Sequence, residues 1–562
     1  MVSLPPFVVF MLGALLVPAI TGKLRRPVLL LIPLLSGANV LNLEPGESWQ
    51  LPFLDYQLIP VRVDELSVLF GYLFHLAALI AVIFALHVRD TVQHVAALVY
   101  AGSAIGAVFA GDLITLFIFW ELMAVSSAFL ILARRTDRAT AAGMRYVLIQ
   151  VLSGVMLLAG TVLRLQETGT LAFDLIGLDS PGSLLIFLAF GIKCAFPLLH
   201  TWLTDAYPEA TPTGTVFLSA FTTKVAVYAL SRGFPGTEAL VYIGAVMTCF
   251  PIFYAVIEND LRRVLAYSMI NQLGFMVCGI GIGTALAVNG AVAHAFNDVL
   301  FKGLLMMSMG AVLHMTGRIN GSELGGLYKS MPMTAALCIV GAASISAFPL
   351  FSGFVSKSMI MVAVLEEGHA GVWLALLFAS AGVFHHAGIK IPFFAFFAHD
   401  AGLRTREPPR NMLIAMGIAA GLCVFIGVYP WTLYELLPFE VAYTPYDATH
   451  VVAQLQLLFF SALAFTWLKL TNLYPPELRS VNLDAEWIYR KAIPAAVRGV
   501  RHASMPLNNA VSHELHGRML RLGQTVYRQC GPQSALARTW LSGRMVLWVA
   551  ALLGGYLLFY YL

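Results

Sequence analysis

Apolar segments of about 20 residues recur along this sequence of 562 residues. A helix that crosses a bilayer needs ~20 predominantly apolar residues, so most of these segments are long enough to do so. The chain is 59% hydrophobic and 11% charged, which leaves too little polar surface to cover a soluble globular protein of this length. We therefore predict an all-α polytopic membrane protein with about 14–16 transmembrane helices. The segments lie at 5–20, 27–42, 64–87, 93–110, 112–133, 142–162, 182–200, 212–232, 238–258, 263–284, 287–313, 332–366, 370–397, 410–430, 451–471 and 543–561.

A short motif occurs twice, each time where an apolar helix is interrupted by proline. Residues 195–198 read Ala-Phe-Pro-Leu and residues 347–350 repeat them, with Lys193 and Lys357 nearby. Paired interruptions in two halves are typical of transporters built from structural repeats, with the functional site at the broken helices. The sequence thus predicts six parts: 1–92, N-terminal transmembrane helices; 93–235, a first repeat; 236–400, a second repeat; 401–471, C-terminal transmembrane helices; 472–542, a basic amphipathic lateral segment; and 543–562, a final transmembrane helix.

Basic and acidic residues alternate between successive loops. Arginine and lysine gather at 134–145, 262–263, 318–329 and 404–410, whereas the opposite loops carry glutamates at 366–367, 435 and 440. The positive-inside rule places the basic loops in the cytoplasm and the N-terminus on the other side of the membrane. Between the second and third segments, residues 43–63 are polar and partly alternating, which predicts a short hairpin outside the membrane.

Residues 472–542 differ from the rest of the chain because basic and apolar residues are interleaved there. This pattern predicts helices that lie along the cytoplasmic face of the membrane or along a partner subunit. A solvated basic tail is the alternative. The last apolar segment favours the first interpretation, because it would return the chain to the membrane.

Charged residues inside the apolar segments indicate an internal polar path. Lys193 and Lys224 flank a polar elbow, and a lysine at the centre of a bilayer costs at least ~2.5 kcal/mol. Glu121 lies far from either end of its own segment. Such a carboxylate and either lysine can modulate each other's protonation. A structural ion pair that moves no proton is the alternative.

The second half holds further candidates for this path. His294, Asp298 and Lys302 are spaced four residues apart, on one face of a helix, and suit a relay of proton donors and acceptors. The alternative is a satisfied hydrogen-bond cluster. Lys357 and Lys390 also lie within apolar segments. Of the neighbouring pair at 385 and 386, we expect at most one histidine to line the path.

The sequence indicates no cofactor and no enzyme active site. It contains no nucleotide-binding loop, no flavin motif and no HExxH-like pair of metal ligands. The six cysteines are scattered, without the spacing of a metal site or a disulfide framework. The net charge of +4 is modest and follows membrane topology, so we expect no nucleic-acid partner.

Several motifs resemble those of the antiporter-like subunits shared by Mrp-type sodium/proton antiporters and respiratory complex I. The resemblance covers roughly residues 60–430, and the D-type Mrp subunit is most similar. The motifs are Phe119-Trp120-Glu121-Leu122-Met123, the run His200-Thr201-Trp202-Leu203-x-Asp205-Ala206, Glu209-Ala210-x-Pro212-Thr213, residues 268–275 (SMINQLGF), and His294 with Phe301-Lys302.

The resemblance implies two inverted five-helix repeats and a role for each matching residue. Glu121 and Lys193 would form the charge pair of the first half, Lys224 would be the connecting lysine, His294 would be central, and Lys357 would lie toward the other end. Lys302 matches a lysine found in several members. Gln272 stands where some relatives have histidine, so water would have to bridge that step, and Asp298 is an additional acid.

The resulting hypothesis is a proton-translocating membrane subunit of a multisubunit cation/proton antiporter, not an enzyme by itself. Its expected partners are the other membrane subunits, the lipid bilayer, protons, and Na⁺ or K⁺; its expected location is the bacterial inner membrane. The lateral segment and final helix are more similar to the longest antiporter-like subunit of complex I than to a minimal D-type chain. A proton-pumping or energy-coupling subunit of a complex I-like redox or inorganic-carbon uptake complex is therefore the alternative, and a scaffold that has lost transport is a third possibility.

Overall fold

The computed structural model describes residues 4–46, 48–478, 482–532, 534 and 542–561. Each apolar segment predicted from the sequence contains helix, which confirms an all-α polytopic membrane protein. Among the described residues, 12 helices are long and apolar enough to cross a membrane by themselves. The chain divides into two compact units, Met1–Asn482 and Leu483–Leu562.

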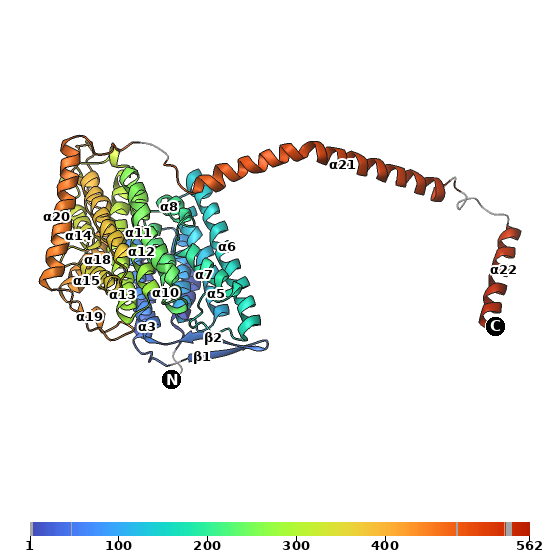
Figure 1. Cartoon of the computed structure of the whole chain (residues 1–562), viewed down its shortest axis with the longest axis horizontal. Coiled ribbons are helices and arrows are strands. Elements are labelled where there is room, and N and C mark those ends of the chain that lie inside the picture. Colours follow the sequence, from blue (N-terminus) through green and yellow to red (C-terminus); the bar gives the residue numbers. More distant parts are fainter. Residues whose placement is uncertain (1–3, 47, 479–481, 533, 535–541, 562) are drawn as a thin grey trace. The chain divides into compact units, whose positions relative to one another are not determined.

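The first unit begins with three α-helices, two short 3₁₀ helices and a hairpin. These elements are α1 (Pro6–Leu16), η1 (Val17–Ala19), η2 (Gly22–Leu24), α2 (Arg25–Val40), β1 (Ser48–Phe53), β2 (Tyr56–Arg62) and α3 (Glu65–Ala85). The two strands pair antiparallel, as the polar stretch at 43–63 predicts. Figure 1 shows the helices of this unit side by side, with the hairpin at one end of the bundle.

Two similar series of helices follow. The first contains α4 (Thr91–Phe109), α5 (Leu113–Leu132), α6 (Asp137–Thr168), α7 (Pro181–Lys193), α8 (Thr201–Ala206), η3 (Tyr207–Glu209), α9 (Gly214–Ala220) and α10 (Thr222–Gly233). The second contains α11 (Glu238–Ile257), α12 (Leu261–Ile282), α13 (Ala285–Thr316), η4 (Gly321–Glu323), η5 (Leu327–Lys329), α14 (Pro332–Ile345), α15 (Ser352–Glu366), α16 (Ala370–Val383), η6 (Phe384–Ile389), α17 (Lys390–Pro392) and η7 (Phe393–Phe397). The unit ends with α18 (Arg410–Val428), α19 (Trp431–Tyr434) and α20 (Ala448–Leu470).

Local structure is similar in the two series. Asp112 caps the N-terminus of α5 and bridges to Ala172, just as Asp260 caps α12 and bridges to Asn320. The helices that follow, α6 and α13, are both 32 residues long. Each ends at a glycine with a left-handed φ, which closes the last turn of the helix. The equivalence therefore extends well beyond the repeated four-residue motif.

The repeats run in opposite directions through the bundle. At the C-terminus of α5, the carbonyl of Leu130 accepts a hydrogen bond from Thr211 N at 3.3 Å. At the N-terminus of α12, Arg262 donates to the carbonyl of Ala210 at 3.0 Å. Equivalent helices thus end and begin at the same end of the bundle. This end carries the loops 86–90, 133–136, 258–260 and 398–409, and we call it the basic end.

Both predicted helix breaks are present, and their backbones match. Ala195 and Leu198 after α7, and Ala347 and Leu350 after α14, all have positive φ. Residues other than glycine rarely adopt this conformation, and such strained positions persist where the surrounding structure holds them. The segment predicted at 182–200 is therefore a half-helix followed by an unwound stretch.

Side chains satisfy the carbonyl groups that the breaks expose. Trp202 Nε1 donates to the carbonyl of Ile192 at 2.8 Å, and Lys357 Nζ donates to that of Ile345 at 3.3 Å. Non-helical backbone at membrane depth is tolerated only where such partners exist. The second break thus directly positions one of the candidate lysines.

The second unit begins at Leu483, so it contains the predicted lateral segment without its first residues, 472–482, and it also contains the final span. It comprises η8 (Ile488–Ala492), the 38-residue helix α21 (Ile493–Cys530) and α22 (Ser542–Tyr561). At 1.5 Å per residue, α21 is ~57 Å long. Large apolar side chains of α22 such as Leu547 and Phe559 are exposed. Their exposure suits a helix surrounded by lipid or by another protein chain.

Close packing of α11 against α12 gives a test of the fold. A Cβ at Gly274 would lie 2.6 Å from Thr248 N and 2.7 Å from the carbonyl oxygen of Gly244. Because both are backbone atoms, Gly274→Ala must push the helices apart, and we expect a loss of about 1–3 kcal/mol in the free energy of unfolding. The measurement is thermal unfolding of the purified protein.

Gly421→Ala, in α18, is the matched control because a Cβ there meets no atom within 4 Å. Equal melting temperatures for Gly274→Ala and Gly421→Ala would contradict the packing described for α11 and α12.

Candidate functional site

The candidate residue pair of the first repeat lies between α5 and α7. Lys193 is fully buried at the C-terminus of α7, and its Nζ donates to the carbonyl of Trp120 at 2.5 Å. The same ammonium lies 4.4 Å from the centre of the Trp120 ring. Glu121 interacts with Lys193 electrostatically, while its Oε1 atom is buried without a hydrogen-bond partner among the described residues. The two predicted residues are therefore neighbours.

Gly154 makes room for the Glu121 side chain. A Cβ at Gly154, on α6, would lie 1.6 Å from Glu121 Oε1, which is far inside van der Waals contact. The carboxylate thus packs directly against the backbone of α6. Any larger residue at position 154 would displace it.

A buried ion pair joins the first repeat to the second. Lys224 Nζ on α10 lies 2.5 Å from Asp298 Oδ2 on α13, and both side chains are 0% exposed. Lys224 also donates to the carbonyl of Ser219 at 3.2 Å. The sequence offered either Lys193 or Lys224 as the partner of Glu121. The structure places Glu121 with Lys193 and gives Lys224 its own carboxylate.

The three residues spaced along α13 face different partners. His294 contacts Gln272 Oε1 through Nε2 and Ser356 Oγ through Nδ1, both at 3.0 Å. Lys302 Nζ donates to Ser268 Oγ at 2.8 Å. In the predicted stripe, His294 thus contacts α12 and α15, Lys302 contacts α12, and Asp298 contacts α10. Gln272 reaches the histidine ring directly, so the water bridge expected at that step is not needed for this contact.

Asp298 is nevertheless the electrostatic centre of the group. It interacts with Lys302 and Lys357 in addition to its ion pair with Lys224. Lys357, 2% exposed, also lies 4.9 Å from the centre of the Phe275 ring. Three buried lysines thus share the field of one carboxylate.

Lys390 lies at the basic end of the bundle, away from this group. Its Nζ donates to the carbonyls of Val256 at 2.7 Å and Glu258 at 2.6 Å, just past the end of α11. Glu477, which follows α20, places its Oε1 3.0 Å from the same nitrogen. Sequence reasoning missed Glu477, because it stands in the part of the chain assigned to the lateral segment.

His386 fills the space between the central group and Lys390. It is fully buried on η6, and neither ring nitrogen has a hydrogen-bond partner among the described residues. It interacts electrostatically with both Lys302 and Lys390. Its neighbour His385 instead stacks on Tyr474, with ring centres 5.5 Å apart. Both histidines interact electrostatically with Lys390, and His386 alone of the two also interacts with Lys302.

Buried hydroxyl groups form a second feature that the sequence did not reveal. Tyr100 OH lies 2.6 Å from Thr222 Oγ1, two residues before Lys224. Tyr146 OH lies 2.8 Å from Ser127 Oγ, and the Tyr207 side chain interacts with those of Tyr100 and Tyr146. Single tyrosines in apolar helices give no pattern by which these contacts could be found.

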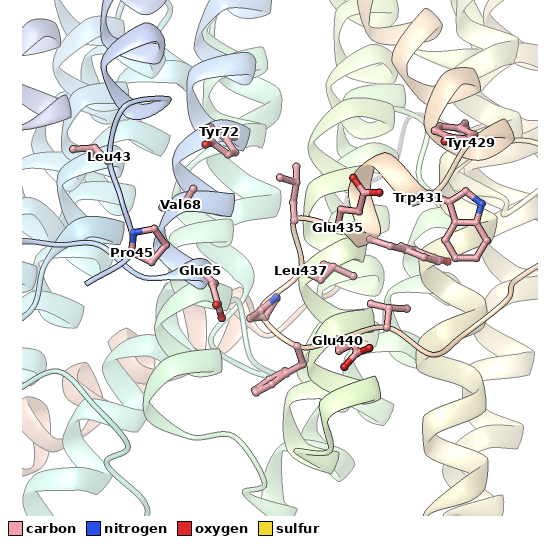
Figure 2. A pocket seen from close by; sticks show the side chains of 15 residues that line it. Leu43, Pro45, Glu65, Val68, Tyr72, Tyr429, Trp431, Glu435, Leu437 and Glu440 are labelled. Atoms are coloured by element: carbon pink, nitrogen blue, oxygen red, sulfur yellow. The ribbon is translucent and has the colours of Figure 1, made fainter. Parts of the chain in front are cut away.

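A recess at the end of the bundle opposite the basic end carries acidic side chains. It has a volume of about 740 Å³ and lies between the start of α3 and the chain around α19. Glu65, Glu435 and Glu440 are among the side chains that line it (Figure 2). Phe439, in the wall of this recess, forms backbone hydrogen bonds with the side chain of Asn289. Asn289 lies on α13, the same helix as His294.

The chemistry available to these residues is proton exchange and charge pairing. Within the described ranges, no group of three or more histidine, cysteine, aspartate or glutamate residues could hold a metal ion. Lysine, histidine, carboxyl and hydroxyl groups can all pass protons to one another or to water. We call the set Glu121, Lys193, Lys224, His294, Asp298, Lys302, Lys357, His386 and Lys390 the charged axis.

Comparison with known proteins finds a family similar to part of this chain. Residues 110–384 match the family described as NADH:quinone oxidoreductase/Mrp antiporter, transmembrane. This part of the chain is therefore similar to the transmembrane domain of that family. The D-type chain of the Na(+)/H(+) antiporter of Alkalihalophilus pseudofirmus is 33% identical over 50% of this chain and 62% of its own length. Hydrogenase-4 component B of Escherichia coli is 25% identical over 83% of this chain and 78% of its own length.

Solved structures of other membrane complexes share the fold. The chain resembles one in the Mrp complex from Dietzia sp. DQ12-45-1b, with a TM-score of 0.65 and 19% identity over 82% of this chain and 95% of that chain. It also resembles one in the membrane-bound sulfane sulfur reductase, an archaeal respiratory membrane complex, with a TM-score of 0.71 and 21% identity over 97% and 99% of the two chains. The expectation of an antiporter-like fold is confirmed.

The ion pair at the centre of the axis predicts a clear stability pattern. Asp298→Leu leaves Lys224 charged and unpaired in the interior, and removal of one partner from a buried pair costs about 3–5 kcal/mol. Lys224→Met leaves the carboxylate unpaired and should have a similar effect. The double variant removes both charges, so we expect it to regain most of the lost stability in thermal unfolding.

If the losses of the two single variants simply add in the double variant, the two side chains do not interact in the folded protein. Lys329→Ala is the control, because it removes a lysine that forms an ion pair with Asp400 in an exposed loop.

Proposed function

We propose that this chain is the proton-translocating membrane subunit of a multisubunit monovalent cation/proton antiporter. The observation that carries the proposal is the charged axis, in which buried lysines from both repeats lie beside ionisable partners. Burial of so many ionisable groups is expensive in a membrane, and such residues mark ion pathways by default. The similarity to chains of Na(+)/H(+) antiporters supports the same function.

In this proposal, protons move from group to group along the axis at mid-membrane depth. Glu121 sets the proton affinity of Lys193 by approaching or leaving it, because a nearby carboxylate favours the charged lysine. The hydroxyl cluster around Tyr100 and Thr222 would connect Lys193 to Lys224. A proton arriving at Asp298 would neutralise the carboxylate, weaken its pairing with Lys224 and shift the balance of charge toward Lys302 and Lys357.

Two openings would connect the axis to water. The acidic recess beside α19 suits the extracytoplasmic side, because it concentrates cations where the wall contacts α13. The surroundings of Lys390 at the basic end suit the cytoplasmic side under the positive-inside rule. The N-terminus would then be extracytoplasmic, in a bacterial inner membrane.

The partners we propose are further membrane subunits, with protons and Na⁺ or K⁺ as transported ions. The similar solved structures belong to multisubunit complexes, which supports a hetero-oligomeric assembly. The match to this chain covers 52% of the length of the A-type chain of the Alkalihalophilus pseudofirmus Na(+)/H(+) antiporter, and 62% of its D-type chain. The activity of those whole proteins is therefore part of the proposal.

A second function, an energy-coupling subunit of a redox-driven complex, is favoured by the coverage of the full chain. The similar chain of the sulfane sulfur reductase complex matches 97% of this one, a share that extends beyond the membrane core. The match to Hydrogenase-4 component B likewise covers 83% of this chain. In this case the same axis would move protons, and a partner's electron transfer would drive them.

Cation-dependent proton movement in inverted vesicles distinguishes the two functions. The host lacks its own antiporters and expresses the whole gene cluster, either with the wild-type chain or with Glu121→Ala, Lys224→Ala or the control Lys329→Ala. We expect added Na⁺ or K⁺ to dissipate the proton gradient in the wild type and the control, and loss of this response by about tenfold or more in the two axis variants.

Equal protein levels in all vesicles make the comparison valid. A wild type that ignores cations but drives redox-linked proton movement would favour the second function. Full cation response in both axis variants would contradict the proton path itself.

A further inference from the structure

The chain reverses immediately after α20 and returns to the bundle. Asn472 has a positive φ, and the backbone N–H groups of Leu473 and Tyr474 both donate to the carbonyl of Leu468 at 3.0 Å. Asparagine tolerates this conformation better than most residues. The turn directs the following residues back to the bundle, although they fall in the predicted lateral segment.

Aromatic contacts hold the returning segment in place. The Tyr474 ring lies 5.2 Å from that of Phe465 and 5.5 Å from that of His385, measured between ring centres. The ammonium of Lys469 lies 5.5 Å from the centre of the Tyr474 ring and 5.1 Å from that of Phe394. Cation–π and aromatic contacts of this kind each contribute on the order of 0.5–1.5 kcal/mol. The segment is therefore packed against η6 and η7, the helices that flank Lys390.

Glu477 reaches Lys390 from this segment. Its side chain is 7% exposed, Lys390 is 0% exposed, and Oε1 lies 3.0 Å from Nζ. Lys390 already donates to two carbonyl groups, and among the described residues it is the one donor that the structure gives the Glu477 carboxylate. The carboxylate is held by charge attraction without the network of donors that a purely structural buried acid needs.

The neighbouring Glu258 differs from Glu477 because several hydrogen-bond donors hold its carboxylate. Its Oε1 accepts hydrogen bonds from the backbone N–H groups of Asn259 and Asp260, and its Oε2 accepts one from Asn482 Nδ2 at 3.0 Å. These donors hold both oxygens of the Glu258 carboxylate in place. Glu477 has no such set among the described residues, so its charge depends on Lys390 and its surroundings.

We infer that Glu477 is a further residue of the proton path, the carboxyl group through which Lys390 exchanges protons with the basic end of the membrane. This inference rests on the proposed function. Transfer of a proton from Lys390 to Glu477 leaves a neutral amine and a neutral acid, so no new charge is created in the interior. A neutral Glu477 no longer attracts Lys390 and can turn toward water, release the proton and return as a carboxylate.

The electrostatic surroundings of Glu477 agree with this role. Burial raises the pKa of the Glu477 carboxyl, while the charges of Lys390 and Lys469 lower it and that of Glu258 raises it; the net direction is upward. A carboxyl group with a raised pKa is protonated for a larger fraction of the time near neutral pH. The same segment leads on to the second unit, so a partner that binds there could alter the position of Glu477 through the chain.

Glu477→Gln and Glu477→Asp in the assembled complex test the inference. Glutamine keeps the size but cannot exchange a proton, so we expect proton flux in proteoliposomes to fall by about tenfold or more. Aspartate keeps the chemistry, so we expect measurable flux with its pH dependence moved to lower pH, since aspartic acid is the stronger acid. Glu514→Gln, in an exposed part of α21, is the matched control.

Assembly and flux are measured on the same preparations. Wild-type flux in Glu477→Gln would overturn the inference and leave the proposed function intact. A double variant, Glu477→Gln with Lys390→Gln, has a neutral pair at this contact. If it restores both assembly and flux, the contact only holds the segment in place, and the inference is overturned. Absence of proton movement in the wild type would overturn the proposed function and, with it, this inference.

Discussion

The buried ion pair between Lys224 and Asp298 is the contact on which the account of this protein depends. An isolated charge in the interior of a membrane protein is unstable, whereas two opposite charges 2.5 Å apart stabilise each other. One partner lies in the last helix of the first repeat and the other in a long central helix of the second. The pair therefore ties the repeats together and gives the charged axis its centre.

The inverted repeat explains why an axis of this kind can exist. Each repeat contains one half-helix that stops inside the bundle, and the strained residues that follow it are the same in both copies. The breaks free carbonyl groups at membrane depth, and lysine or tryptophan side chains satisfy them. Because the two series of helices run in opposite directions, buried polar residues of both can meet, as they do at the Lys224–Asp298 pair.

The sequence predicted the helices and the breaks well because both follow from local patterns. Apolar length sets the spans, and the repeated Ala-Phe-Pro-Leu marks the interruptions. The sequence also identified most residues of the axis, since a lysine inside an apolar segment is rare. The sequence could not show which of these residues contact one another. Lys224 and Asp298 are far apart in the chain, and only the packing of α10 on α13 shows that they meet.

Residues outside this pattern were missed for a physical reason. Glu477 lies in a polar stretch, where a glutamate is ordinary, and only the turn after α20 brings it to Lys390. The hydroxyl groups of Tyr100 and Tyr146 lie in apolar helices in which a single tyrosine has no special meaning. Their role depends on which helix faces meet, and neither hydropathy nor spacing contains that information.

The most direct test of the central claim is the rate of proton flux through the assembled complex in the variants Asp298→Asn and Asp298→Glu. Asparagine keeps the shape but removes the charge, and glutamate keeps the charge on a longer side chain. The account predicts that Asp298→Asn, at equal levels of assembled complex, loses flux by about tenfold or more, while Asp298→Glu retains a measurable part. Undiminished flux in Asp298→Asn would contradict the account, because the path would then not need the charge that joins the two repeats.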